Sequence, residues 1–190
     1  MIGSLSKAIR KNTSPPVRTL RTAGGRLRHP DTTLVFLVEA AHLIVEDWAG
    51  QKVGAHGLGL HLTVFYPFFP VSRLEVSHQD GLAEILAAVE PIEYSLTRTG
   101  LFSGGFYLAP EPAEPFIDLT QRIQARWPRL QPYRGHYDTV IPHVLISDGH
   151  QATPNIDTLE GHLPINAKAS ALTLARETFR GWRTIRTYQL

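Results

Sequence analysis

The chain has 190 residues, of which 43% are hydrophobic, so it can bury a sizeable core in one domain or in two small lobes that share one. It contains no cysteine, which excludes disulfides, thiolate nucleophiles and cysteine-based zinc or iron–sulfur sites. It also lacks an apolar run long enough to span a membrane, and we expect a cytoplasmic protein without a membrane partner.

The formal net charge of +2 hides an uneven distribution along the chain. The first 30 residues hold seven basic and no acidic side chains, and Pro15-Pro16 and Gly24-Gly25 interrupt any regular element there. Because this stretch has little apolar area to bury, we predict a flexible basic arm over residues 1–31. The remaining 12 basic and 17 acidic side chains give a net charge of −5, without the basic stripe that is typical of domains that grip long nucleic acids.

The first half of the folded part alternates predicted strands and helices. A continuous apolar run at residues 33–38 predicts a strand covered on both faces, and apolar residues then recur at helical spacing over 41–48. Glycines mark a loop at 50–59, which leads into a strand at 61–66. Apolar positions three and four residues apart predict an amphipathic helix over 79–90.

The second half continues in the same way. A strand over 92–102 and its partner over 106–108 flank a Ser-Gly-Gly turn, and a helix with an apolar stripe follows between Pro115 and Pro128. The remaining predictions are a loop, a strand, a short helix and a closing hairpin, at 129–139, 140–147, 155–162, and 169–177 with 182–188. This order predicts an α+β domain over residues 32–190 with two pseudo-repeated lobes, each of which contributes one strand that begins with a histidine.

The two histidine strands are the most informative feature of the sequence. Side chains alternate between the faces of a strand, so His61, Thr63 and Phe65 share one face of the first strand. In the second strand, His143 and Leu145 share a face, while the residues between them point the other way. If the strands lie side by side, two imidazoles enter one cleft, where one histidine can act as general base and the other as general acid.

These strands carry a resemblance to a known family. His61-Leu62-Thr63-Val64 resembles the His-x-Thr/Ser-apolar motif of the 2H phosphoesterases, which include the bacterial 2′-5′ RNA ligase-like proteins. His143-Val144-Leu145-Ile146 lies where the second motif of that family is expected, but Leu145 occupies the Thr/Ser position. The resemblance covers roughly residues 32 to 190 and also includes Tyr66-Pro67-Phe68, the segments 96–102 and 106–110, Pro142 and Trp182-Arg183.

The resemblance implies both a fold and an activity. The fold is a bilobal pair of small antiparallel sheets with outer helices and a central cleft. The activity is that of a metal-independent phosphoesterase on a 2′,3′-cyclic phosphate or a related RNA-end phosphodiester, with His61 and His143 as the catalytic acid and base. Ligation in the reverse direction would then need no ATP. We therefore expect no cofactor and no metal, a nucleotide or RNA end as partner, and a monomeric protein.

Two further groups of residues are candidates for substrate binding. Thr63 can donate its hydroxyl to phosphate oxygens, and Phe65 shares its face. The polar aromatic loop before the second histidine strand can act as a lid, with Arg134 paired to a phosphate and Tyr133 or Tyr137 stacked on a base. The alternative for this loop is a solvated connection. A metal site built on His136, His143 and His150 is rejected, because Pro142 and Gly149 prevent the continuous helix that it needs.

Leu145 keeps a second function open. Without a hydroxyl at this position, the site loses one hydrogen-bond donor, and the typical cost of such a loss is about 10²–10³ in rate. The alternative to the enzyme is therefore a catalytically weakened module that only binds a nucleotide or an RNA end. Another alternative is a fold used for protein interaction, with the basic arm as its contact.

Overall fold

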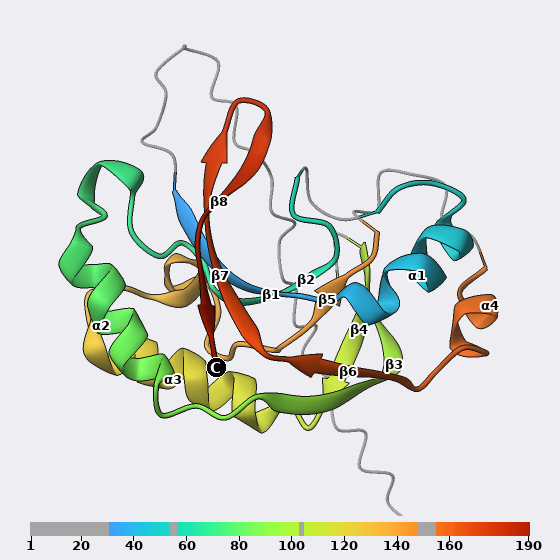
Figure 1. The fold of residues 1–190 in the computed structure, drawn as a ribbon. Helices are drawn as coiled ribbons and strands as arrows, with labels where there is room; N and C mark the ends of the chain where they lie inside the picture. The colour runs from blue at the N-terminus through green and yellow to red at the C-terminus, as the bar shows by residue number, and fades with distance from the viewer. Residues whose placement is uncertain (1–30, 54–56, 103–104, 148–154) are drawn as a thin grey trace, which may run out of the picture.

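The computed structural model describes residues 31–53, 57–102, 105–147 and 155–190. The predicted basic arm, apart from Asp31, lies outside the described residues. The described chain forms one antiparallel sheet of eight strands in the order β6-β3-β4-β5-β2-β1-β7-β8 (Figure 1). The strands are β1 Thr32–Leu37, β2 His61–Phe65, β3 Ile92–Phe102, β4 Gly105–Glu111, β5 Val144–Leu145, β6 Ile165–Ala169, β7 Ala171–Thr178 and β8 Gly181–Gln189.

The helices supply apolar side chains to a core on one face of this sheet. Phe116, Leu119 and Ile123, spaced as one stripe of α3, are buried in the same cluster as Leu62 and Val144 of the histidine strands. The helical elements are η1 Glu39–Ala41, α1 His42–Ala49, η2 Val71–Arg73, α2 Val76–Leu86, α3 Glu114–Arg126, η3 Pro132–Gly135 and α4 Ile156–Glu160. Among the residues that the structure describes, no helix is long and apolar enough to cross a membrane.

The predicted α+β fold with outer helices is confirmed, with one change in its architecture. The two small sheets of the prediction are halves of a single curled sheet, because β5 pairs with β4 of one half and with β2 of the other. The strand predicted over 140–147 is shorter in the structure, where it consists of the two residues of β5. Pro142 contributes to this, since it has no backbone N–H to donate to a neighbouring strand.

Two other predictions differ from the structure. The closing strand predicted over 169–177 is β7, but β6, at Ile165–Ala169 just before it, was not predicted. The pattern of β6, with alanines at 167 and 169, has too little β-branched or aromatic character to mark a strand. The helix predicted over 79–90 begins three residues earlier, at Val76, where Glu75 and His78 form a reciprocal capping box.

Candidate active site

The two histidine strands lie side by side at the centre of the sheet. Leu62 of β2 pairs with Val144 of β5 in antiparallel register, and both side chains are fully buried in the core. One residue away on either side, the register places His143 opposite Thr63 and His61 opposite Leu145, all on the face that points away from the core. These four side chains are only partly buried, which agrees with the alternation.

Both imidazoles are held in the same way. Nδ1 of His61 lies 2.9 Å from the carbonyl oxygen of Gly59, and Nδ1 of His143 lies 2.8 Å from that of Ile141. A carbonyl oxygen can only accept, so each Nδ1 carries the proton and donates it. In the neutral form, each Nε2 therefore keeps its lone pair for a ligand, and in the charged form it becomes an N–H donor.

Burial lowers the pKa of both histidines below the ordinary value of 6.5. The hydrogen bonds to Gly59 and Ile141 act in the opposite direction, because they favour the charged imidazole, but burial has the larger effect. Charge on His61 also lowers the pKa of His143, which shows that the two rings are close enough to repel each other when both are charged. At most one of the two imidazoles is therefore favoured in the charged form at a time.

The hydroxyl environment of the two histidines is unequal. Thr63 stands opposite His143 and offers a hydroxyl on the cleft face. Leu145 stands opposite His61 and offers only methyl groups, and its other neighbour across the sheet is Tyr107 of β4. The site thus has a polar row through Thr63 and His143 and an apolar row through Leu145 and His61.

Two aromatic side chains from the segments 96–102 and 106–110, which were not predicted as site residues, contact His143. The ring of Phe102 meets it edge-on with centroids 4.8 Å apart, and the ring of Tyr107 does so at 5.8 Å. Phe102 and Tyr107 stack on each other at 4.2 Å. Tyr107 covers Gly100 of the opposite strand, where a Cβ atom would lie 2.2 Å from its ring, so any other residue there would displace the ring of Tyr107. The sequence contains these residues, but only strand pairing shows that they reach the site.

Phe65 does not belong to the cleft face, and the prediction that it binds substrate is wrong. Its side chain is 0% exposed and packs edge-on against Phe68 in the core. The cause is a β-bulge: Val35 pairs with Thr63 but Leu34 pairs with Phe65, so Val64 is an extra residue on β2. The bulge puts both Val64 and Phe65 on the core face and ends the simple alternation.

The predicted lid loop lies at the other end of β2 from His61. The backbone N–H of Tyr133 donates to the carbonyl of Tyr66, the residue after β2, and Arg134 forms an ion pair with Asp31. Tyr133 and Arg134 both have positive φ, of 50° and 59°, and Tyr133 meets Tyr137 edge-on. The guanidinium of Arg134 is thus already engaged by a carboxylate, and its role as a phosphate ligand stays a prediction.

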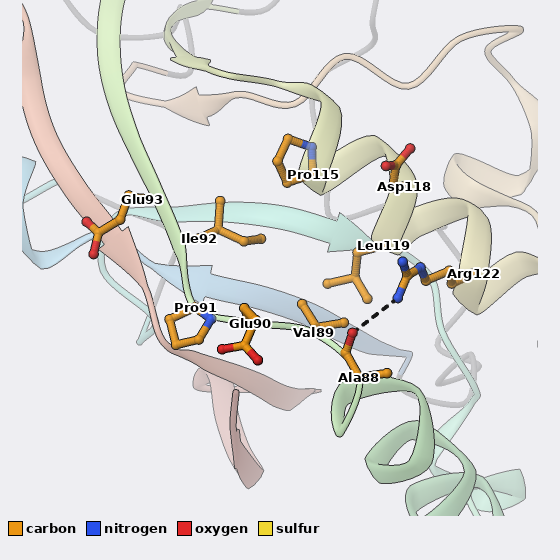
Figure 2. A pocket seen from close by; sticks show the side chains of 10 residues that line it. All are labelled: Ala88, Val89, Glu90, Pro91, Ile92, Glu93, Pro115, Asp118, Leu119 and Arg122. Atoms are coloured by element: carbon orange, nitrogen blue, oxygen red, sulfur yellow. Dashed lines mark hydrogen bonds between the residues drawn. The ribbon is translucent and has the colours of Figure 1, made fainter.

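A groove of about 360 Å³ lies elsewhere, between the end of α2, the start of β3 and α3 (Figure 2). Ile92 and Leu119 form its floor, and carboxylates stand at its rim. Arg122 crosses one end and donates to the carbonyl of Ala88. Neither histidine lines this groove, so it is not the site of the acid–base pair.

A known protein family matches the part of the chain that carries this site. The family model of the 2′-5′ RNA ligase superfamily matches residues 37–178. A comparison with curated protein sequences found no significant match.

Among solved structures, the chain is similar to TT0787 of Thermus thermophilus, with a TM-score of 0.59 and 19% identity over 84% of this chain and 97% of that one. It is similar to E. coli LigT complexed with NADP+, with a TM-score of 0.57 and 15% identity over 86% of this chain and 99% of that one. LigT complexed with 3′-AMP gives a TM-score of 0.55 and 17% identity over 85% and 98%. At such identities the similarity shows the fold alone.

Proposed function

Because the chain belongs to the 2′-5′ RNA ligase superfamily, we propose that it is a metal-independent phosphoesterase that opens a 2′,3′-cyclic phosphate by two-histidine acid–base catalysis. One observation carries this proposal: both histidines donate Nδ1–H to a backbone carbonyl, and among the described residues no hydrogen bond engages either Nε2, on the same face of the sheet. Two such nitrogens, with the hydroxyl of Thr63 on the same face, form the minimum set for proton transfer to and from a phosphodiester.

The proposed reaction needs the two histidines in opposite protonation states. The neutral Nε2 takes a proton from water while the water oxygen attacks phosphorus. The charged Nε2–H gives its proton to the ribose oxygen as the P–O bond breaks, which leaves a phosphomonoester and a ribose hydroxyl. In ligation, a ribose hydroxyl of a second strand end takes the place of water. After either reaction the two histidines have exchanged protonation states, and proton exchange with solvent restores them.

The lowered pKa values of the pair support a role for the substrate in charging the site. Near pH 7 both imidazoles of the free protein are mostly neutral, because burial disfavours the charged form. The negative charge of a bound phosphodiester favours one imidazolium, and repulsion between the histidines disfavours a second. Substrate binding would thus create the acid–base pair that the reaction requires.

The nature of ligands bound to proteins of the same fold also supports a nucleotide substrate. E. coli LigT has been crystallised with NADP+, 3′-AMP and ATP, all of which carry phosphate on a ribonucleotide. For this chain, we extend that to a ribonucleotide or RNA end with a cyclic phosphate. The monomeric state and the cytoplasmic location stay predictions.

The decisive experiment is a turnover assay of the purified protein on nucleoside 2′,3′-cyclic phosphates, with and without EDTA. Turnover that survives EDTA supports the proposal. Turnover that EDTA abolishes would contradict the metal-independent mechanism.

Leu145 favours a second candidate, a module that binds the RNA end without turning it over. It is half-buried on the cleft face where the family motif has a hydroxyl. Binding of a nucleotide without turnover in the same assay would favour this candidate over the enzyme.

A further inference from the structure

The two site histidines differ in the side chains that stand beside them. The rings of Phe102 and Tyr107 meet the imidazole of His143 edge-on, at interplanar angles of 76° and 70°. The neighbours of His61 across the sheet are instead aliphatic, namely Leu37 of β1 and Leu145 of β5. The sheet thus gives His143 an aromatic flank, which we examine as part of the acid–base site.

The aromatic flank comes from the β3–β4 hairpin. Phe102 is the last residue of β3, and Tyr107 lies near the start of β4. Tyr107 pairs with Leu145 of β5 and with Gly100 of β3, so Tyr107 and Phe102, two residues beyond Gly100, share the cleft face with His143. The two rings stack on each other with an interplanar angle of 18°, and Phe102 is only 8% exposed. Each ring therefore supports the other at its contact with the imidazole.

Gly100 makes room for this arrangement. A Cβ atom at this position would lie 2.2 Å from the ring of Tyr107 and 2.4 Å from its hydroxyl oxygen. The ring of Tyr107 therefore leans across from β4 onto the backbone of β3, where it meets Phe102. A side chain at position 100 would push the ring away from this place.

Two kinds of contact together fix the imidazole of His143. Its Nδ1–H donates to the carbonyl of Ile141, which anchors one atom of the ring. A single hydrogen bond still lets the imidazole tilt about that atom. The rings of Phe102 and Tyr107 lie against the imidazole and oppose such a tilt. A side chain that is held by both packing and a hydrogen bond keeps one orientation, here the one in which Nδ1 carries the proton.

The same rings also contribute to the burial of His143. Burial is the largest cause of its lowered pKa, while the hydrogen bond to Ile141 raises the pKa and charge on His61 lowers it. The titratable or charged side chains on the same face of the neighbouring strands are His61 of β2, Tyr107 of β4 and Arg98 of β3. Removal of a ring that covers the imidazole would expose it to water and favour its charged form.

We propose that Phe102 and Tyr107 are positioning residues for His143, which hold its imidazole in one orientation and keep water away from one side of it. This inference rests on the proposed function, because it gives the two rings a part in the proton transfer that His143 would perform. They act through the imidazole and take no direct part in the chemistry.

The experiment uses two full-length variants that disturb the rings in different ways. Phe102→Ala removes one ring, whereas Gly100→Ala keeps both rings and displaces that of Tyr107. Phe106→Ala is the matched control, because Phe106 is a neighbouring ring of β4 that packs against the core on the opposite face.

Three properties are measured for each protein. NMR titration of the histidine Cε1 protons gives the pKa of His143 and of His61, with His61→Gln and His143→Gln used to assign the signals. The ¹⁵N shifts of the imidazoles show which nitrogen carries the proton in the neutral form. Steady-state kinetics on a nucleoside 2′,3′-cyclic phosphate give kcat and KM at several pH values.

We expect both variants to raise the pKa of His143 but not that of His61, and to lose part of the Nδ1–H form of His143. The kcat should fall by roughly 10-fold with little change in KM, because a tilted imidazole transfers its proton less well. The pH optimum should move upward with the pKa of His143. Tyr107→Phe keeps the ring and should keep the pKa of His143, and Phe106→Ala should leave the pKa values of both histidines unchanged.

Other outcomes would overturn the inference. An unchanged pKa and protonated nitrogen of His143 in both Phe102→Ala and Gly100→Ala would mean that the rings do not hold the imidazole. An equal change in Phe106→Ala would mean that any loosening of β4 disturbs the site. If Phe102→Ala does not fold, Gly100→Ala still decides, since it removes no side chain. If the unmodified protein turns over no substrate, the proposed function fails, but the NMR measurements still show whether the rings position His143.

Discussion

At the scale of single residues, Leu145 distinguishes this site from a symmetric one. Its side chain is half-buried on the cleft face, between Tyr107 of β4 and His61 of β2. The row of Thr63 and His143 offers a hydroxyl to a phosphate oxygen, and the row of Leu145 and His61 does not. The two histidines thus share a cleft but not an environment.

We expect Leu145→Thr to raise turnover, by up to about 10², because it supplies a second hydroxyl to charge that develops on phosphate. The melting temperature should change little, since a half-buried cleft position loses few contacts. Val144→Thr is the matched control: its hydroxyl would enter the core and cost about 1–3 kcal/mol without a gain in rate. A destabilised Leu145→Thr protein with unchanged turnover would show that this position serves packing.

The histidines themselves predict an acid-shifted pH profile. Catalysis needs one neutral and one charged imidazole, so kcat/KM should be bell-shaped, and its optimum should lie below pH 6.5 because both pKa values are lowered in the free protein. Bound phosphate raises these pKa values, so the optimum of kcat should lie at higher pH than that of kcat/KM.

His61→Ala and His143→Ala should each reduce turnover by at least about 10².

The measurement is a pair of steady-state profiles over roughly pH 4.5 to 8.5, a range that brackets the ordinary histidine pKa. A flat kcat/KM profile, or an optimum well above pH 7, would argue against the pair. Full activity in a folded His143→Ala protein would show that the second motif takes no part in catalysis.

At the scale of elements, the bulge in β2 decides which side chains reach the cleft. Thr120 of α3 lies beneath it, with Oγ1 2.9 Å from the carbonyl oxygen of Val64, the extra residue of the bulge. This buried hydroxyl, which also lies 2.9 Å from the carbonyl oxygen of Phe116, can donate its one proton to the carbonyl of Val64 at the point where the pairing of β1 and β2 shifts. The helix therefore helps to fix the register in which His61 and Thr63 face outward.

We expect Thr120→Val to lower the free energy of unfolding by about 1–3 kcal/mol, because the buried carbonyl of Val64 loses its hydroxyl donor. Thr120→Ser keeps the hydroxyl and serves as the control, which should lose less stability. Chemical denaturation of the three proteins gives the comparison. Equal stability of the valine and serine variants would mean that the hydrogen bond contributes nothing at this site.

The elements that sequence could predict are those with a strong local pattern. The apolar run of β1, the stripe of α3 and the alternation around His61 and His143 all appear in the structure. The bulge at Val64 has no such signal, because two successive apolar residues also fit an ordinary buried strand end. For the same reason, strand alternation alone could not predict that Phe65 lies on the core face.

The pairing register of strands that are distant in the sequence was the other feature that the sequence could not predict. Phe102 and Tyr107 reach His143 only because β3, β4 and β5 pair in a particular order. Pairing between distant segments depends on the whole sheet, and no local pattern encodes it. The family resemblance was confirmed, because it rested on motifs that are local.

At the scale of the whole molecule, the two histidines couple folding to pH. Their pKa values are lowered in the folded protein, so below pH 6.5 the unfolded chain binds more protons than the folded one. Stability contributed by these neutral, buried imidazoles is present above pH 6.5. It is lost as the pH falls through that value toward the lowered pKa values.

We therefore expect the melting temperature to fall between about pH 7.5 and pH 5, and to fall less in the double variant His61→Gln with His143→Gln. Calorimetry at the two pH values measures both differences. His42→Gln with His162→Gln is a suitable control on other elements. Identical pH dependence in all three proteins would mean that the site histidines are not the groups that titrate on unfolding.

The short strand β5 joins the two halves of the sheet over few residues. Among the described residues, one residue pair joins β5 to β2 and two join it to β4, and just beyond β5 the N–H groups of Ile146 and Ser147 also donate to the carbonyl of Phe106. The sheet is therefore narrowest where its two halves meet. His61 and Thr63 belong to β2, and His143 directly precedes β5. A phosphate bound to all three would link the two halves of the sheet. After product release, the two halves would move more freely relative to each other. Amide hydrogen exchange near Val144 would then report occupancy of the cleft, even in a variant that has lost all turnover.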